Sequence, residues 1–307
     1  MYTDIDVSII YVNYFTSDLI YNSVKSIINK IKNLKFEIIV VDNNSEPDLS
    51  EKFRAFIEDG LRIQFVYLKE NKGFGGANNA GAKKAIGEYL FFLNPDTLLL
   101  NNALEILAEF LDSNPQAGGC GGNLFSENQT PAFSYRKEFP GLKWEMGYLT
   151  HQFFRPTSKI IYRYHNFSTQ PIEVSYISGA DMMLRKSIWG KCKGFSEDIF
   201  MYYDDADICY KIQKLGYKLY NVPAAQIIHL EGKSFKEDSL INPHKIKIQE
   251  KSRITYLNKN MKKWRKFLTN GVYYLFLSSR GWLLSDVNQK EYYHLRKFYF
   301  RKFLRED

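Results

Sequence analysis

The chain has few cysteines and no apolar run long enough to cross a bilayer. Its 307 residues include three cysteines, Cys120, Cys192 and Cys209, and no two of them form a Cys-x-x-Cys pair. This spacing excludes a paired-thiol motif, so we expect reduced thiols that fill the core. No secretory signal opens the chain, and its uncharged stretch 267–279 is shorter than the about 20 residues of a spanning helix. These absences predict a cytoplasmic protein.

Acidic residues are scarce toward the C-terminus. From residue 243 onward there are 16 Lys and Arg against 5 Asp and Glu, a balance of +11, whereas the whole chain carries +8. The preceding residues therefore balance at −3. Such asymmetry indicates an anionic partner for the tail. The composition, 45% hydrophobic and 16% aromatic, is otherwise typical of a globular protein.

Apolar runs of strand length alternate with helical patterns in the first part of the chain. The predicted strands are 7–12, 36–41, 63–68 and 89–93. The predicted helices are 17–32, 48–59, a short one following the glycine-rich stretch 71–81, and 102–111. This alternation predicts an α/β fold with a mostly parallel, doubly wound sheet.

The pattern becomes irregular after Gly118. Residues 123–170 lack a clear period, and we expect loops with short strands there. Order returns with predicted strands at 174–177, 182–184, 219–222 and 226–229 and a helix at 206–215. From Pro243 onward the pattern is helical and basic.

Polar residues follow two of the predicted strands directly. Asp42 begins the segment Asp-Asn-Asn-Ser, where a carboxylate can accept a hydrogen bond from a nucleobase or ribose, or form a turn with its own backbone. Asn94-Pro95-Asp96 ends the next strand. Mg²⁺ and Mn²⁺ prefer oxygen ligands and combine one or two carboxylates with substrate phosphates. Asp96 is therefore a candidate metal ligand, although the tripeptide is also a common turn.

The stretch Asn71–Gly81 is rich in glycine but matches no phosphate-binding fingerprint. Its spacing breaks the Gly-x-Gly-x-x-Gly pattern, it follows the third strand, and it lacks the Lys-Ser/Thr pair of a P-loop. Glycines before a helix can still expose backbone N–H groups to a diphosphate. The alternative explanation for these glycines is that they allow a helix to pack closely on the sheet.

Asp204, Asp205 and Asp207 lie within one helical turn. Mutual repulsion should raise the pKa of at least one of them, which suits a general base acting on a sugar hydroxyl. The alternative explanation for the three acids is that they favour the positive N-terminal end of the helix dipole. His229 ends a predicted strand, where a lone histidine is more often structural than a ligand.

Together these segments resemble family 2 glycosyltransferases, within them the rhamnosyltransferase-like branch. The likeness spans roughly residues 6–235 and is carried, in order, by Val7–Asn13, Val41–Ser45, Asn71–Gly81, Leu93–Asp96, Ser178–Ala180, Gly194-Phe195, Met201–Asp207 and His229. The resemblance implies a GT-A fold and an inverting transfer from a nucleotide-activated sugar. This chain departs from the commoner Asp-x-Asp by having Asn94 at the first position, and it has Asp204 where many relatives carry Glu.

The resemblance also assigns roles to residues. Asp205 would be the catalytic base, with Asp204 beside it, and Asp96 and His229 would bind Mg²⁺ or Mn²⁺. The nucleotide-sugar pocket would comprise Val12, Asn13, Asp42, Asn44, Asn71, Gly73, Phe74, Asn78 and Asn94. The acceptor or sugar pocket would comprise Gly179, Ala180, Asp181 and Tyr203.

We expect a catalytic domain at residues 1–242, with a nucleotide-sugar half at about 1–122 and an acceptor half at about 123–242. The preferred donor is deoxythymidine-diphosphate rhamnose, with a uridine-diphosphate hexose as the alternative. The acceptor would be a glycan or lipid-linked saccharide in surface polysaccharide synthesis. The alternative outside the enzymes is a non-catalytic subunit that binds nucleotide sugars or glycans.

Residues 243–307 are expected to form a helical extension. Aromatic and basic residues interleave there, which suits a helix at the surface of an anionic membrane, on the inner face of the cell membrane. A basic helical lid or a homodimer surface is the alternative. Nucleic acid is not an expected partner, because no recognised binding module accompanies the charge.

Overall fold

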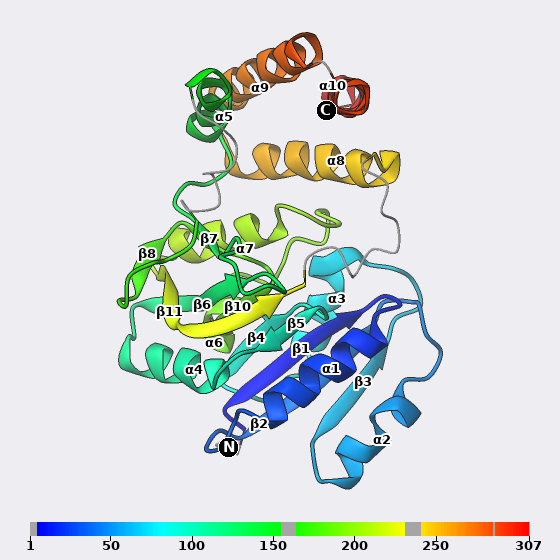
Figure 1. The fold of residues 1–307 in the computed structure, drawn as a ribbon, viewed down its shortest axis with the longest axis vertical. Coiled ribbons are helices and arrows are strands. Elements are labelled where there is room, and N and C mark those ends of the chain that lie inside the picture. Colours follow the sequence, from blue (N-terminus) through cyan, green and yellow to red (C-terminus); the bar gives the residue numbers. More distant parts are fainter. Residues whose placement is uncertain (1–4, 155–163, 231–240, 285, 307) are drawn as a thin grey trace.

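The computed structural model describes residues 5–154, 164–230, 241–284 and 286–306, and Figure 1 shows an α/β body beneath a layer of helices. The strands are β1 (Val7–Asn13), β2 (Phe36–Asp42), β3 (Ile63–Tyr67), β4 (Tyr89–Leu93), β5 (Thr97–Leu99), β6 (Ala117–Phe125), β7 (Tyr135–Arg136), β8 (Ile172–Val174), β9 (Tyr176–Ile177), β10 (Asp181–Arg185) and β11 (Lys218–His229). The helices are α1 (Ser17–Ile28), α2 (Ser50–Glu58), α3 (Gly73–Ala82), α4 (Ala103–Ser113), α5 (Leu142–Phe154), α6 (Lys186–Lys191), α7 (Asp204–Lys214), α8 (Pro243–Asn260), α9 (Lys263–Leu283) and α10 (Val287–Arg305).

The main sheet has the order β3-β2-β1-β4-β10-β6-β11-β5, and β8 also pairs with β11. Strands β3, β2, β1 and β4 are parallel, and β10 runs antiparallel between β4 and β6. The apolar runs of β1, β2 and β4 are buried on both faces, as in parallel sheets covered by helices. One face packs against α1, α2 and α4, and the other against α3, α6 and α7. The predicted α/β fold with a mostly parallel sheet is confirmed.

Two predictions for the middle of the chain are wrong. Residues 117–125 form the long strand β6, and α5 lies within the stretch predicted to be irregular, of which residues 155–163 lie outside the described part. The glycines of β6 concealed the strand, because glycine disfavours strands in isolation. They are needed here, since a Cβ at Gly121 would lie 2.3 Å from the Ile177 side chain and one at Gly119 2.3 Å from Leu184.

Two smaller predictions also need correction. The glycine-rich stretch does not precede a helix but forms α3 itself, beginning at Gly73. The strands predicted at 219–222 and 226–229 are one strand, β11, whose pairing with β6 shifts register between Asn221 and Gln226. Pro223 lies at this shift, as expected for a proline inside a sheet.

The predicted helical tail is confirmed, and its helices pack around a buried polar network. Arg253 of α8 is 1% exposed, and its guanidinium donates to Glu145 of α5 at 2.8 and 3.1 Å and to Asn270 of α9 at 3.0 Å. Glu250 of α8 accepts from Arg296 of α10 at 2.6 Å. The ion pairs join α5, α8 and α10, and the hydrogen bond to Asn270 adds α9. An apolar cluster of α8, α9 and α10 closes around them.

The three cysteines are free and buried, as predicted. Among the described residues, no helix combines the length and apolarity that crossing a bilayer requires.

Candidate functional site

Asn13 and Asp42 lie side by side where β1 and β2 end. Parallel pairing aligns the two residues, and the Asn13 Nδ2 donates to the Asp42 Oδ1 at 2.8 Å. Asp42 also accepts from the backbone N–H and the hydroxyl of Ser45, at 2.8 and 2.6 Å. The turn alternative is thus realised, and it fixes the buried carboxylate at the sheet edge. Val12 is half-buried beside it, and the contact of this pair with a nucleobase stays a prediction.

Asn43, which was not among the predicted site residues, links this edge to α3. Its Nδ2 donates to the Asn71 Oδ1 at 2.9 Å, and its Oδ1 accepts from the Lys72 N–H at 2.8 Å. The predicted Asn44 is exposed and adopts a left-handed backbone with φ 63°. The sequence gives little basis for choosing Asn43 over Asn44, because either of two adjacent asparagines after a strand can point inward.

The start of α3 is fixed by Gly73. It has φ +70°, and a Cβ there would lie 1.9 Å from the Phe200 carbonyl oxygen, so no other residue fits. The next N–H, of Phe74, donates to that oxygen at 2.8 Å. Asn78 is buried and donates to the Phe74 carbonyl within its own helix at 3.0 Å. The helix N-terminus is thereby joined to the segment that precedes the acidic cluster.

Asp96 and His229 converge at the ends of β4 and β11. The Asp96 Oδ1 lies 3.4 Å from the His229 Nε2, and the Asn94 Nδ2 lies 3.3 Å from the same nitrogen. Pairing of β11 with β5 sets His229 opposite Thr97 and so brings the imidazole to this point. A carboxylate oxygen and an imidazole nitrogen this close fit two ligands of a divalent cation. Within the described residues no cluster of three or more such side chains occurs.

Asp207 has a structural role. Its carboxylate is fully buried and accepts from the Ser196 hydroxyl at 2.6 Å and from Asn260 Nδ2 at 2.8 Å. Lys211, one turn further along α7, forms an ion pair with it at 3.0 Å. The helix dipole is not needed to explain this residue, since its own partners account for its position.

Within the described residues, neither Asp204 nor Asp205 forms an ion pair like that of Asp207 with Lys211. Burial, and then the charge of Asp205, raises the pKa of Asp204 to about 8. Burial also raises the pKa of Asp205, which is half-buried and accepts from the Ala206 N–H at 2.8 Å. The prediction that at least one pKa is raised is confirmed, but burial rather than repulsion is the larger cause.

The turn before α7 is strained and is supported by α8. Tyr202 and Tyr203 have φ 69° and 65°, a left-handed conformation that costs roughly 1–2 kcal/mol for each such residue. The Tyr203 ring packs against Tyr256 of α8, with centroids 5.8 Å apart. The Asn260 side chain of α8 also holds α7 through Asp207. The C-terminal extension thus supports the backbone that presents the two acids.

The loop 178–180 lies between the two acidic centres. The Asn94 N–H donates to the Ala180 carbonyl at 3.0 Å, and a Cβ on Gly179 would lie 3.5 Å from that of Asp205. Asp96 and Asp205 therefore occupy one edge of the sheet. Asp181 is enclosed in the sheet, where its Oδ2 accepts from the Gly122 N–H at 2.6 Å and burial raises its pKa well above the usual value. Its contact with a sugar stays a prediction.

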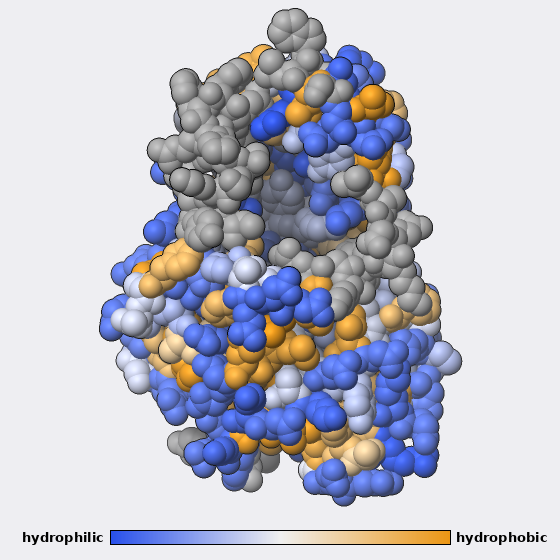
Figure 2. All heavy atoms as spheres, viewed as in Figure 1, coloured by the Kyte–Doolittle hydropathy of each residue, from blue (hydrophilic) through white to orange (hydrophobic). Residues whose placement is uncertain are grey.

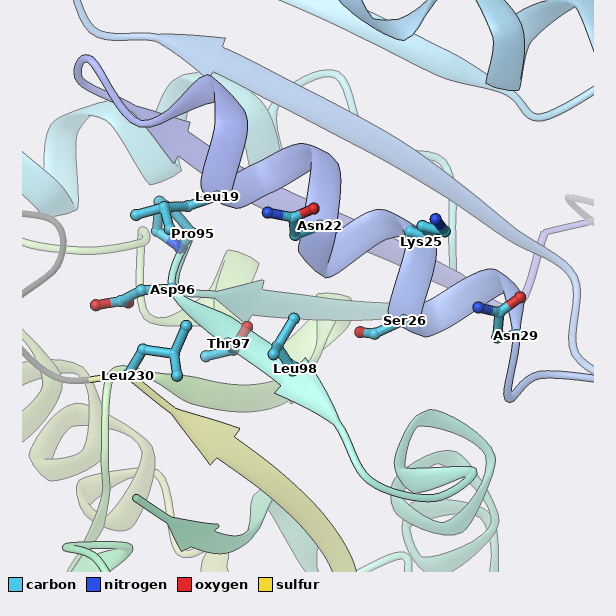
Figure 3. Close-up of a pocket in the computed structure, with 10 residues that line it drawn as sticks. All are labelled: Leu19, Asn22, Lys25, Ser26, Asn29, Pro95, Asp96, Thr97, Leu98 and Leu230. Atoms are coloured by element: carbon cyan, nitrogen blue, oxygen red, sulfur yellow. The ribbon is translucent and has the colours of Figure 1, made fainter. Parts of the chain in front are cut away.

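Two hollows flank this edge. Figure 2 shows a recess between the C-terminal helices and the sheet. A cavity of about 350 Å³ lies beside Asp96 and is lined mainly by α1 and β5. In Figure 3 the carboxylate of Asp96, one of the lining residues, points away from Lys25 of α1 and from Asn29, which follows α1.

Comparison with known sequences gives a family match and several partial relatives. The model of glycosyl transferase family 2 matches residues 8–191. An uncharacterized glycosyltransferase of Rickettsia bellii is 35% identical over 36% of this chain, which spans only 16% of that protein. The N-acetylglucosaminyl-diphospho-decaprenol L-rhamnosyltransferase of Mycobacterium tuberculosis is 24% identical over 66% of this chain and 68% of its own. Rhamnosyltransferase WbbL of Escherichia coli is 26% identical over 63% and 72%.

Solved structures share the fold at low identity. GalNAc-T7 with UDP, GalNAc and Mn²⁺ has a TM-score of 0.62 and 17% identity, covering 98% of this chain and 56% of that one. The mannosyltransferase of Pyrobaculum calidifontis with GDP-Man and Mn²⁺ has a TM-score of 0.61 and 14% identity, covering 98% and 87%. These similarities show the predicted GT-A fold.

The family match covers more than half of the chain and contains Asp42, Gly73, Asp96 and Gly179. It ends before α7, so Asp204 and Asp205 rest on the geometry of their own segment. With the shared fold and the matched range together, the chain belongs to glycosyl transferase family 2.

Proposed function

We propose that the protein catalyses an inverting transfer of a sugar from a nucleoside diphosphate, with Asp205 as the general base. The observation that carries the proposal is the contact of Asp205 with Gly179, whose neighbour Ala180 bonds Asn94 two residues before Asp96. A base and a diphosphate-binding centre on one edge suit in-line displacement at an anomeric carbon.

The acid pair is suited to take one proton. Because the pKa of Asp204 is raised to about 8, Asp204 keeps its proton at neutral pH, and we assign the role of base to the less buried Asp205. Burial raises the pKa of Asp205 and so increases its basicity toward an acceptor hydroxyl. Asp204 keeps its proton and avoids a second buried charge.

The opposite end of the edge would hold the donor. Asn13 and Asp42 would contact the nucleoside, and the N-terminus of α3 would face the diphosphate. Asp96 and His229 would hold Mg²⁺ or Mn²⁺, which when bound would neutralise charge on the leaving diphosphate. The Mn²⁺ in both structural neighbours supports this assignment.

The preferred donor is deoxythymidine-diphosphate rhamnose, and the preferred acceptor is a lipid-linked saccharide of surface polysaccharide synthesis. The two rhamnosyltransferase relatives support the donor, and the mycobacterial one, named for an N-acetylglucosaminyl-diphospho-decaprenol, supports a diphospholipid acceptor. A uridine-diphosphate hexose remains the alternative donor. A non-catalytic nucleotide-sugar or glycan-binding subunit is the alternative function.

The test is a donor panel, with and without Mn²⁺, measured by release of the nucleoside diphosphate. We expect Asp205→Asn to reduce transfer about 10²–10⁴-fold, because a general base is lost, while donor binding by calorimetry persists. Asp198→Asn is the matched control, since that carboxylate is exposed and pairs with Lys259. Turnover of Asp205→Asn near that of the control would reject the base assignment. Donor binding without turnover by the unaltered chain would favour the non-catalytic alternative.

We also propose that the outer face of α9 contacts an anionic membrane. Trp264, Phe267 and Leu275 are 61, 77 and 58% exposed, although the opposite face of the same helix packs through Tyr273 and Leu277. No Asp or Glu occurs between residues 251 and 285, and lysines and arginines flank the exposed apolar residues. Apolar side chains framed by cations complement the negative surface of lipid headgroups.

A further inference from the structure

Arg136 is a half-buried cation on the short strand β7, beside the acid pair. It lies opposite Tyr176 in the pairing of β7 with β9, and β9 leads directly into the loop that contains Gly179. Gly179 contacts Asp205, and the Arg136 charge acts on that carboxylate, lowering its pKa against the larger effect of burial. Arg136 is therefore a neighbour of the proposed base.

Aromatic rings surround the Arg136 guanidinium. Its central carbon lies 3.5 Å from the ring centroid of Phe133, 4.3 Å from that of Tyr164 and 4.5 Å from that of Trp144. Rings stacked on a guanidinium cover its faces and leave its N–H groups available at the edge of the plane. That arrangement holds the side chain in one orientation and suits a bidentate contact with an anion.

No anion within the described residues fills this position. The Arg136 Nε is buried without a hydrogen-bond acceptor there, and the described part of the chain gives Arg136 no ion pair within 4 Å. Arg253 and Arg296 differ, since they pair with Glu145 and Glu250, whereas Arg280 of α9 shares a buried Nε without an acceptor but lies away from the acid pair. A buried donor without an acceptor is costly, so an oriented cation of this kind indicates an external anionic ligand.

We propose that Arg136 binds a phosphate group of the acceptor, which makes the acceptor a phosphorylated, lipid-linked saccharide. The inference rests on the proposed function in one respect, that Asp205 faces the acceptor hydroxyl. Arg136 adjoins Asp205, whereas the donor diphosphate is assigned to Asp96 and His229 beyond the loop 178–180. Phosphate oxygens accept two parallel hydrogen bonds from a guanidinium, as an unpaired arginine with stacked faces requires.

A binding experiment on the full chain tests this assignment without turnover. Farnesyl diphosphate is titrated calorimetrically into protein whose donor pocket is saturated with deoxythymidine diphosphate and Mn²⁺. We expect Arg136→Met to weaken binding roughly 10–100-fold, the range for charge-assisted hydrogen bonds, and Arg136→Lys to weaken it less. Arg54→Met, which removes an exposed arginine of α2, is the control and should bind like the unaltered chain. Neutral farnesol should bind all four proteins equally.

A kinetic experiment links the site to the acceptor. N-acetylglucosaminyl-diphospho-farnesol is compared with octyl N-acetylglucosaminide at saturating donor. Arg136→Met should raise the KM for the diphosphate acceptor roughly 10–100-fold and leave the KM for the neutral acceptor and the donor Kd within about twofold.

Three results would overturn the proposal: no binding of farnesyl diphosphate by the unaltered chain, equal binding by Arg136→Met and the unaltered chain, or an equal rise in the KM for octyl N-acetylglucosaminide in Arg136→Met. If the unaltered chain transfers sugar to neither acceptor, the proposed function fails for these substrates. The calorimetric comparison then still decides the role of Arg136.

Discussion

At the residue scale, three aspartates of one helical turn differ in chemistry because their surroundings differ. Asp207 has a lysine, a serine and an asparagine as partners and is structural. Asp204 is buried without such partners, and its raised pKa follows from the cost of a buried charge. Asp205 lies between these cases, half-buried and next to Arg136. Position along the helix alone does not distinguish the three.

Asp204→Asn is expected to remove a destabilisation that grows with pH. In the folded chain Asp204 keeps its proton up to about pH 8, whereas in the unfolded chain it loses the proton near pH 4. Between these values the folded state binds more protons, so the free energy of unfolding falls as pH rises. The stability gain of the variant should therefore be small at about pH 4 and reach roughly 2–5 kcal/mol at pH 8.5. Urea unfolding at both pH values measures it, and parallel pH profiles for variant and unaltered chain would contradict it.

Asp96→Ala is expected to abolish cation-dependent transfer. The variant removes the carboxylate that lies 3.4 Å from His229, so the cation would lose one of two protein ligands. Titration with Mn²⁺ should show activity reduced at least about tenfold and the midpoint moved to higher Mn²⁺. Asn22→Ala, on the α1 wall of the cavity beside Asp96, serves as control. An unchanged Mn²⁺ midpoint in Asp96→Ala would remove this residue from the metal site.

At the element scale, the ends of β1 and β2 and helix α3 are joined by short polar side chains. Asn43 binds Asn71, and Asn79 of α3 binds both backbone groups of Phe195 at 2.9 Å. The Asn79 contacts, together with the Phe74 N–H that donates to the Phe200 carbonyl, hold α3 against the segment that leads to α7. The donor edge and the acid pair are therefore linked through backbone, which keeps their relative position fixed.

Gly73→Ala is expected to disrupt this junction. The added methyl group would need a left-handed backbone and would overlap the Phe200 carbonyl at 1.9 Å. We expect a loss of at least about 2 kcal/mol in unfolding free energy together with weaker donor binding. Gly190→Ala, in α6, is the matched control, because no atom lies within 4 Å of its added Cβ. Urea unfolding and donor calorimetry compare the two, and equal stability of both variants would be inconsistent with the strain at Gly73.

At the scale of the whole molecule, the helical layer connects the proposed acceptor site to the proposed membrane surface. Trp144 of α5 stacks near Arg136, and the adjacent Glu145 binds Arg253 of α8. The exposed face of α9 lies on the outside of this same layer, as Figure 1 shows for the helices above the sheet. A buried ion pair leaves an uncompensated charge when one partner is lost, so this network favours a single arrangement of the helices.

Binding to anionic vesicles tests the surface of α9. Phe267→Ser and Leu275→Ser remove exposed apolar groups worth about 0.8 kcal/mol per buried CH₂ in lipid. Each should reduce co-sedimentation with phosphatidylglycerol-containing vesicles at least about fivefold, whereas Ile57→Ser, an exposed site on α2, should not. Vesicles of phosphatidylcholine alone should bind the unaltered chain weakly. Unchanged sedimentation of both α9 variants would show that this face does not bind lipid. If the variants instead convert a dimer of the unaltered chain to a monomer, the face is a dimer interface.

The sequence by itself determined the strand–helix alternation, the polar residues at strand ends and the basic helical tail. These features depend on local periodicity and composition, which are legible without knowledge of distant contacts. The family resemblance, now shown, rested on the same local segments in order. Strand β6 was not predicted, because glycine-rich segments rarely form strands. The reason for its glycines lies in the fold, where the side chains of Ile177 and Leu184 pack against them.

Only the tertiary structure decided which polar residues meet. Pairing of β11 with β5 brings His229 to Asp96, and the loop 178–180 brings Gly179 to Asp205. The aromatic rings stacked on Arg136 are also visible only in the fold, because Trp144 and Tyr164 are distant from Arg136 in sequence. Burial, which raises the pKa of Asp204, is likewise a property of the assembled fold, because the excluded water depends on residues remote in sequence.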